Sequence, residues 1–104
     1  MTEHEKRDAG QLYDANFDPA LLKERQHAAE LCFRFNAYPP AAPERYALLH
    51  DLLGTVDPSC TVLSPFQCDY GYNIHLGENF FANHGLVILD GAKQRRESIT
   101  CGSA

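Results

Sequence analysis

The amino-acid sequence predicts an α+β fold, in which a short N-terminal helical cap is followed by the first coils of a left-handed parallel β-helix with a hexapeptide repeat. Two observations support this prediction. The first half of the chain has helical periodicity with capping residues, and from Val62 onward apolar residues recur at every sixth position. The predicted divisions are a helical cap at 1–57, the start of the β-helix at 58–92, and a tail outside the repeat at 93–104.

The cap is expected to begin with two helices. Thr2 and Glu5 have the spacing of a capping box, which predicts a short helix running through residues 11–13. The next helix begins at Asp18-Pro19, a favourable N-cap followed by a proline in the first helical position. Its apolar residues share one face: Leu21, Ala28, Cys32 and Phe35.

A third helix is expected after the proline-rich segment 37–43, which breaks the second. Pro43 can open this helix, and Gly54 is a suitable C-terminal residue. The residues that it presents to the core are Tyr46, Leu49, Leu52 and Leu53.

The second half of the chain contains two apolar series with a period of six. The first series is Val62, Cys68, Ile74, Phe80, Leu86 and Ala92, and the second is Tyr70, Leu76, Ala82 and Ile88. Two inward-facing residues that lie two positions apart are typical of a short strand. The Gly and Asn residues between successive pairs suit tight corners. The alternative is an ordinary β-meander with coincidental spacing.

The net charge of −5 argues against a general nucleic-acid binder, which needs a basic face. The sequence has no apolar run of membrane-spanning length and its start lacks the apolar core of a signal peptide, so we expect a cytoplasmic protein that does not bind a membrane. The four cysteines form no C-x-x-C pair and are interpreted as reduced thiols. A zinc site is a minor alternative, built from Cys60, Cys68, His75 and His84.

Two segments resemble a known family. The stretch from Pro65 to Asn83, PFQCDYGYNIHLGENFFAN, and the following VILD at 87–90 are similar to the maltose, galactoside and nodulation acetyltransferases, which are hexapeptide-repeat sugar O-acetyltransferases. The leading AGQLYD at 9–14 and the later Glu24-Arg25 resemble the helical cap of that family. The similarity covers residues 5 to 93.

The resemblance implies acetyl transfer from acetyl-CoA to a hydroxyl of maltose, glucose or a galactoside, in a homotrimer whose active sites lie between subunits. It implies a histidine base and no metal. By position, Asp14, Asp69 and Asp90 correspond to sugar-binding residues. Asn83 corresponds to the residue beside the thioester, where its amide can donate to the oxyanion. The alternative for each is a structural role, as a helix-end acid or a corner residue.

The family's catalytic histidine lies in a Gly-His-Pro-like segment that this sequence lacks, and neither His75 nor His84 matches it. After Ala92 the charged run KQRRE replaces the expected apolar positions. We therefore expect the chain to be a truncated acetyltransferase that is inactive alone. The alternatives are a non-catalytic fragment or trimer-forming assembly module of the same family, and an unrelated carbohydrate-binding module.

Overall fold

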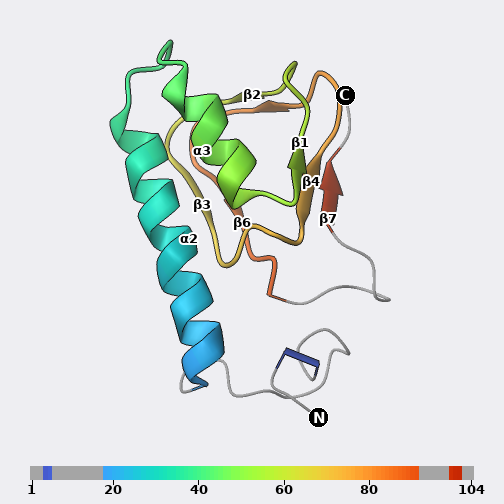
Figure 1. Ribbon diagram of the computed structural model, residues 1–104. Coiled ribbons are helices and arrows are strands. Elements are labelled where there is room, and N and C mark those ends of the chain that lie inside the picture. The colour runs from blue at the N-terminus through green and yellow to red at the C-terminus, as the bar shows by residue number, and fades with distance from the viewer. Residues whose placement is uncertain (1–3, 6–17, 92–98, 102–104) are drawn as a thin grey trace.

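The computed structural model describes residues 4–5, 18–91 and 99–101 (Figure 1). Helix α2 spans Pro19–Ala37 and helix α3 spans Glu44–Leu52. The strands are β1 (Thr55–Val56), β2 (Thr61–Val62), β3 (Phe66–Cys68), β4 (Ile74–Leu76), β5 (Phe81–Ala82), β6 (Leu86–Ile88) and β7 (Ile99–Cys101). The helix predicted through residues 11–13 lies outside the described residues.

Helix α2 begins and packs as its sequence predicts. Asp18 is the N-cap, and its carboxylate accepts a hydrogen bond of 3.0 Å from the backbone N–H of Leu21. The residues predicted to share its apolar face are all buried: Leu21, Ala28, Cys32 and Phe35. The helix ends before Tyr38, where extended backbone leads into the prolines.

Helix α3 begins after Pro43, as expected, but its buried face differs from the prediction. Leu49 and Leu52 are buried, whereas Tyr46 is 39% exposed, so its assignment to the core was wrong. Leu48 and the cationic Arg45 are buried in its place. Apolar periodicity could not identify Arg45, because a charged residue is normally assigned to the solvent face.

Arg45 connects both helices to the strands. Its guanidinium donates to the carbonyl oxygen of Val62 and the hydroxyl of Ser64, each at 2.8 Å, and more weakly to the carbonyl oxygens of Phe35 and Tyr38. It also lies 4.0 Å from the centroid of the Phe35 ring. Burial lowers the pKa of Arg45, but a guanidinium stays charged at neutral pH. Several neutral oxygens therefore stabilise this buried cation.

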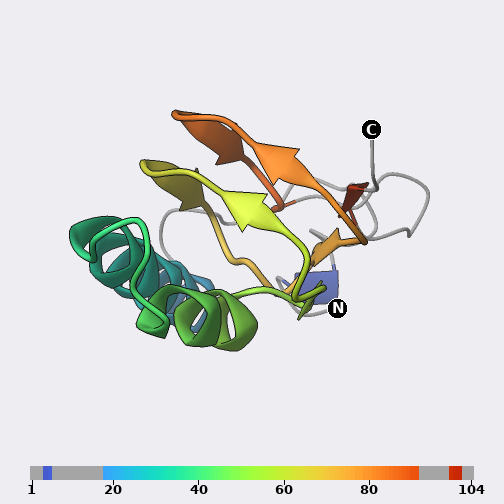
Figure 2. The same ribbon diagram turned by 90° about the horizontal axis from the view of Figure 1, so that it is seen from above.

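The strands form two coils of parallel structure. Three successive strands belong to three different sheets, and the chain returns to the first sheet at β4. Thr55 pairs with His75, Thr61 with Phe81, and Phe66 with Leu86, so one coil takes 20 residues on every face. Seen from above, both helices lie on the side of the first coil, and the second coil lies beyond it (Figure 2).

Two features of the strands differ from the sequence prediction. The coils begin at β1, before the boundary placed between residues 57 and 58. Ile99–Cys101 pairs in parallel with β4 as a third strand of that sheet, within the segment that the prediction places outside the repeat. The charged run after Ala92 predicts only that the hexapeptide repeat stops, and it makes no prediction about strand pairing.

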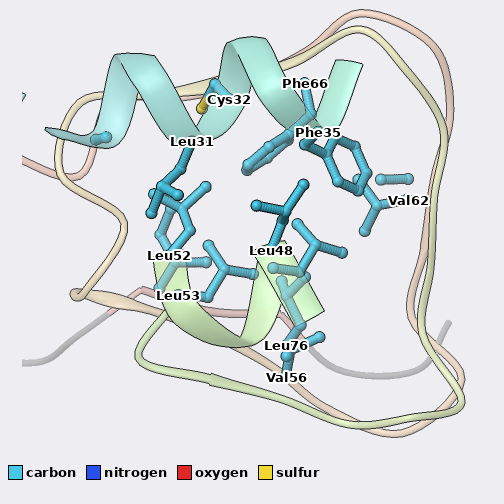
Figure 3. Packing of buried hydrophobic residues seen from close by; sticks show 14 residues of the cluster. Leu31, Cys32, Phe35, Leu48, Leu52, Leu53, Val56, Val62, Phe66 and Leu76 are labelled. Carbon is cyan, nitrogen blue, oxygen red and sulfur yellow. The ribbon is translucent and has the colours of Figure 1, made fainter. Parts of the chain in front are cut away.

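The core lies between the two helices and the first coil. Side chains from α2, α3 and the strands converge there, including Phe35, Leu52, Val62 and Leu76 (Figure 3). The Phe35 and Phe66 rings meet edge to face, with centroids 6.4 Å apart. No helix among the described residues is long and apolar enough to cross a membrane.

Candidate functional site

The corner between β3 and β4 has five residues, 69–73, against three or four at the other corners between β1 and β6, and a buried carboxylate from the next coil holds it. Asp90 is fully buried, and it accepts hydrogen bonds from the backbone N–H groups of Tyr70 at 2.9 Å, Gly71 at 2.7 Å and Asn73 at 3.4 Å. The Asn73 side chain donates in return to the Asp90 carbonyl oxygen at 2.8 Å. These contacts give Asp90 a structural role between the coils, while its role as a sugar ligand stays a prediction.

Asp69 lies at the start of the same corner and is only half-buried. Burial raises the pKa of its carboxyl group, and the negative charge of Asp90 raises that pKa further. The guanidinium of Arg25 on α2 acts in the opposite direction and lowers it. The predicted ligand Asp69 is therefore a partly accessible carboxylate that faces a cation from the helix.

A cavity of about 310 Å³ lies between α2 and this corner. Its lining residues are Lys23, Glu24, His27, Tyr70 and Tyr72. The two tyrosine rings lie 5.7 Å apart, and the Tyr72 hydroxyl donates to the Glu24 carboxylate at 2.7 Å. The other oxygen of Glu24 pairs with the imidazole of His4 at 2.8 Å. Aromatic rings beside polar groups are a common lining for small-molecule sites.

Sequence reasoning did not identify this cavity. Tyr70 was assigned to the β-helix interior, and although it is buried, it lies in the extended corner and lines the cavity. The available signal was the pair of tyrosines on either side of Gly71. A glycine at positive φ between two aromatic residues indicates a turn rather than a continuing strand.

Asn83 lies away from this corner. It precedes β6, whereas Asp90 follows β6, so the two residues are at opposite ends of one face of the β-helix. Asn83 is exposed, and its side-chain oxygen accepts a hydrogen bond of 2.7 Å from the backbone N–H of His84. Asn83 and Asp69 do not meet within one chain.

The two histidines of the second coil have defined partners. His75 shares a hydrogen bond of 2.9 Å with the Thr55 hydroxyl, and His84 Nδ1 contacts the Ser64 carbonyl oxygen. Within the described residues, no group of three His, Cys, Asp or Glu side chains could hold a metal ion, and so the four residues of the alternative zinc site do not come together. The predicted sugar ligand Asp14 lies outside the described residues.

Comparisons with known proteins agree with this architecture. The family model of the maltose acetyltransferase hexapeptide capping motif matches residues 6–57. A protein of Saccharomyces cerevisiae named "Putative acetyltransferase" is 47% identical over 85 residues, which is 81% of this chain and 43% of the yeast protein.

Two solved structures are similar in both fold and sequence. A maltose O-acetyltransferase from Clostridium difficile 630 matches with a TM-score of 0.84 and 45% identity, over 89% of this chain and 50% of that one. A galactoside acetyltransferase in complex with coenzyme A matches with a TM-score of 0.83 and 32% identity, over 98% of this chain and 48% of that one.

The chain thus spans about half the length of the relatives that it matches. The family model covers the N-terminal half of the sequence, and the two solved structures extend the likeness through the coils. The chain belongs to the family of the maltose acetyltransferase hexapeptide capping motif.

Proposed function

We propose that this chain is the acceptor-binding part of a sugar O-acetyltransferase that transfers acetyl from acetyl-CoA to a hydroxyl of maltose, glucose or a galactoside. Family membership supports the reaction class, and the coenzyme A held by the related galactoside acetyltransferase supports the donor. The observation that carries the proposal is the half-buried Asp69 at the corner facing α2. We further infer that the coils wind left-handed, as the hexad spacing predicts.

The sugar in this proposal binds at the corner between β3 and β4. The Asp69 carboxylate accepts a hydrogen bond from a sugar hydroxyl, and Asp14 and Asp90 are proposed to supply further contacts. Because the pKa of Asp69 is raised, its charged form is lost at a higher pH than for an ordinary carboxyl group. As the pH falls, sugar affinity should consequently begin to weaken at a higher pH than it would if an exposed carboxylate held the sugar.

Asn83 is proposed to act on the thioester side of the reaction. Its amide N–H can donate to the oxyanion that forms when the sugar oxygen attacks the acetyl carbonyl. Because Asn83 and Asp69 lie at opposite ends of one face, we infer that they serve different active sites, each shared between two copies in a homotrimer.

Proton removal is proposed to require a histidine outside these 104 residues. A neutral alcohol is a weak nucleophile, and a positioned base contributes about 10²–10⁴-fold to the rate. His75 and His84 lie on β4 and at the β5–β6 corner and have partners there. We therefore propose that residues 1–104 alone do not transfer acetyl groups at an enzymatic rate.

A second candidate function is an assembly module without chemistry. The exposed apolar side chains of the second coil favour it, because Phe81 and Val87 are 58% and 57% exposed. A thiol-release assay with acetyl-CoA and the three sugars distinguishes the two functions. It compares the 104-residue chain with a version extended through a Gly-His-Pro segment, and turnover by the extended version alone is expected.

Substitutions in the extended version test the residue roles. Asp69→Ala should mainly raise the KM for the sugar, and Asn83→Ala should lower kcat about a hundredfold, the scale of losing one oxyanion donor. Glu78→Gln, at another exposed corner, is the control and should change neither constant. Equal and small effects of Asp69→Ala and Asn83→Ala would show that both are only corner residues.

A further inference from the structure

Two cysteines from distant parts of the sequence lie side by side at the edge of the core. Cys32 on α2 and Cys68 on β3 have sulfur atoms 3.9 Å apart, within hydrogen-bonding distance for thiols. Cys32 is fully buried and lies beside Leu31 on α2 (Figure 3), whereas Cys68 is only half-buried. A small reagent can therefore reach the pair through Cys68.

The neighbouring Asn36 fixes the helix against the strand. Its side chain donates to the Phe66 carbonyl oxygen at 3.0 Å and accepts from the Phe66 N–H at 2.9 Å. Cys32 lies four residues before Asn36, about 6.0 Å along a helix. Cys68 lies two residues after Phe66, about 6.6 Å along a strand. Since the two segments run in opposite directions here, these matching lengths bring the two sulfur atoms together.

The contact also makes one thiol easier to ionise. The hydrogen bond from the Cys68 thiol lowers the pKa of Cys32 to about 7, whereas the same bond and burial raise the pKa of Cys68. Either sulfur can be the donor, so the single negative charge of the pair can lie on Cys68 as well. The contact therefore favours a thiolate within the pair, and the thiolate is the reactive form of cysteine.

We propose that Cys32 and Cys68 form a redox-active pair, which a neutral hydroperoxide oxidises to a disulfide that joins α2 to β3. In the first step the Cys68 thiolate attacks a peroxide oxygen: the S–O bond forms, the O–O bond breaks, and hydroxide leaves. In the second step the Cys32 sulfur attacks Cys68, the S–O bond breaks, and water departs with the Cys32 proton. Two thiols lose two electrons, and the peroxide is reduced to water.

The surrounding charges select a neutral oxidant. Asp69 adjoins Cys68, and the negative charge of Asp90 acts on both thiols. An anionic disulfide such as oxidised glutathione is repelled from this environment, whereas hydrogen peroxide is not. Disulfide closure then needs the sulfur atoms to move from 3.9 Å to about 2.05 Å apart.

Mass spectrometry of the folded, reduced protein tests the proposal. Hydrogen peroxide followed by denaturation and alkylation should leave two of the four cysteines unlabelled and yield a peptide pair joined through Cys32 and Cys68. The Tm should rise by about 15 °C or more, as expected for closing a loop of this length, and fall back on reduction. Oxidised glutathione should react more slowly than peroxide.

Two variants assign the chemistry to individual thiols. Cys32→Ser should stop at a Cys68 sulfenic acid, which a cyclic diketone captures. Cys60→Ser is the matched control, because the Cys60 thiol donates to the Gly77 carbonyl oxygen at 3.0 Å, and it should still form the cross-link. Absence of the Cys32–Cys68 peptide from the oxidised wild-type protein, or pairing of Cys68 with Cys60 or Cys101, would overturn the proposal. Mass spectrometry of the oxidised wild-type protein tests the proposal even if a variant fails to fold.

Discussion

The two coils share a backbone register but differ in what covers them. In the first coil Val62 and Phe66 are buried beneath the helices. At the positions paired with these two in the second coil, Ala82 is buried but Leu86 is only partly buried. Phe81 and Leu89, elsewhere in the second coil, are 58% and 70% exposed. The hexad pattern thus sets the path of the chain, whereas burial at each position depends on the structure stacked against it.

The largest expected effect comes from the carboxylate that joins the coils. Asp90→Ala removes the acceptor for three backbone N–H groups at a buried corner, and we expect a loss of about 4 kcal/mol in the free energy of unfolding. Asn83→Ala, at the exposed corner, should cost less than about 1 kcal/mol. Urea denaturation measures both, and similar losses would show that the corner at residues 69–73 is no more important than the other.

Substitution of one glycine in each of these two corners tests how strongly the backbone conformation of each corner is constrained. Gly71 and Gly85 both have positive φ, at 91° and 88°. A Cβ at Gly71 would lie 2.4 Å from the Leu52 carbonyl oxygen, whereas a Cβ at Gly85 would have nothing within 4 Å. Gly71→Ala should therefore cost about 3 kcal/mol, from strain and steric clash, and Gly85→Ala about 1 kcal/mol, from strain alone. Thermal unfolding of both variants checks the difference, and equal costs would contradict it.

Substitutions at the exposed apolar residues of the second coil should have the smallest effect on stability and the largest effect on self-association. The exposed apolar side chains of the second coil, and the edges of β5 and β6, which pair with no further strand in the described part of the chain, should make the chain self-associate at about tens of micromolar, as light scattering would show. The double variant Phe81→Asp with Val87→Asp should reduce the mass of the assembly and leave the unfolding free energy nearly unchanged. Phe33→Asp, at an even more exposed site on α2, is the control. A well-behaved wild-type monomer would contradict the prediction.

The helices were largely predictable because their signals are local. The Asp18-Pro19 start of α2 and its four buried apolar residues follow from capping and periodicity alone. The burial of Arg45 was not predictable, because it depends on carbonyl oxygens from Phe35, Tyr38 and Val62, which only the tertiary fold brings together.

The coils were predictable in type but not in exact register. Strand β3 directs Phe66 and Cys68 inward, and β4 directs Ile74 and Leu76 inward, as pairs separated by two. The long corner between these strands adds two residues to the hexad spacing. A series of period six that occupies the second inward position of β3 therefore occupies the first inward position of β4. The sequence alone cannot separate this insertion from two continuous series, because the offset between the series is also two.

Among the site residues, sequence could place Asp69 at a corner but could not show its surroundings. Its raised pKa arises from burial and from Asp90, which is 21 positions away in the sequence. The cavity beside it likewise combines Glu24 from α2 with Tyr72 from the corner. Such contacts depend on how the helix packs against the coil, and this packing cannot be read from the periodicity of the sequence.

The hydrogen bonds of Asp90 also impose an order on folding. Residues 70, 71 and 73 belong to the corner that completes the first coil, yet their acceptor is at the end of the second coil. During synthesis, the corner would therefore wait for about one further coil to emerge from the ribosome before its backbone N–H groups were satisfied. We expect the first coil to become resistant to proteolysis only after the second one has been made, so that its maturation lags by one coil.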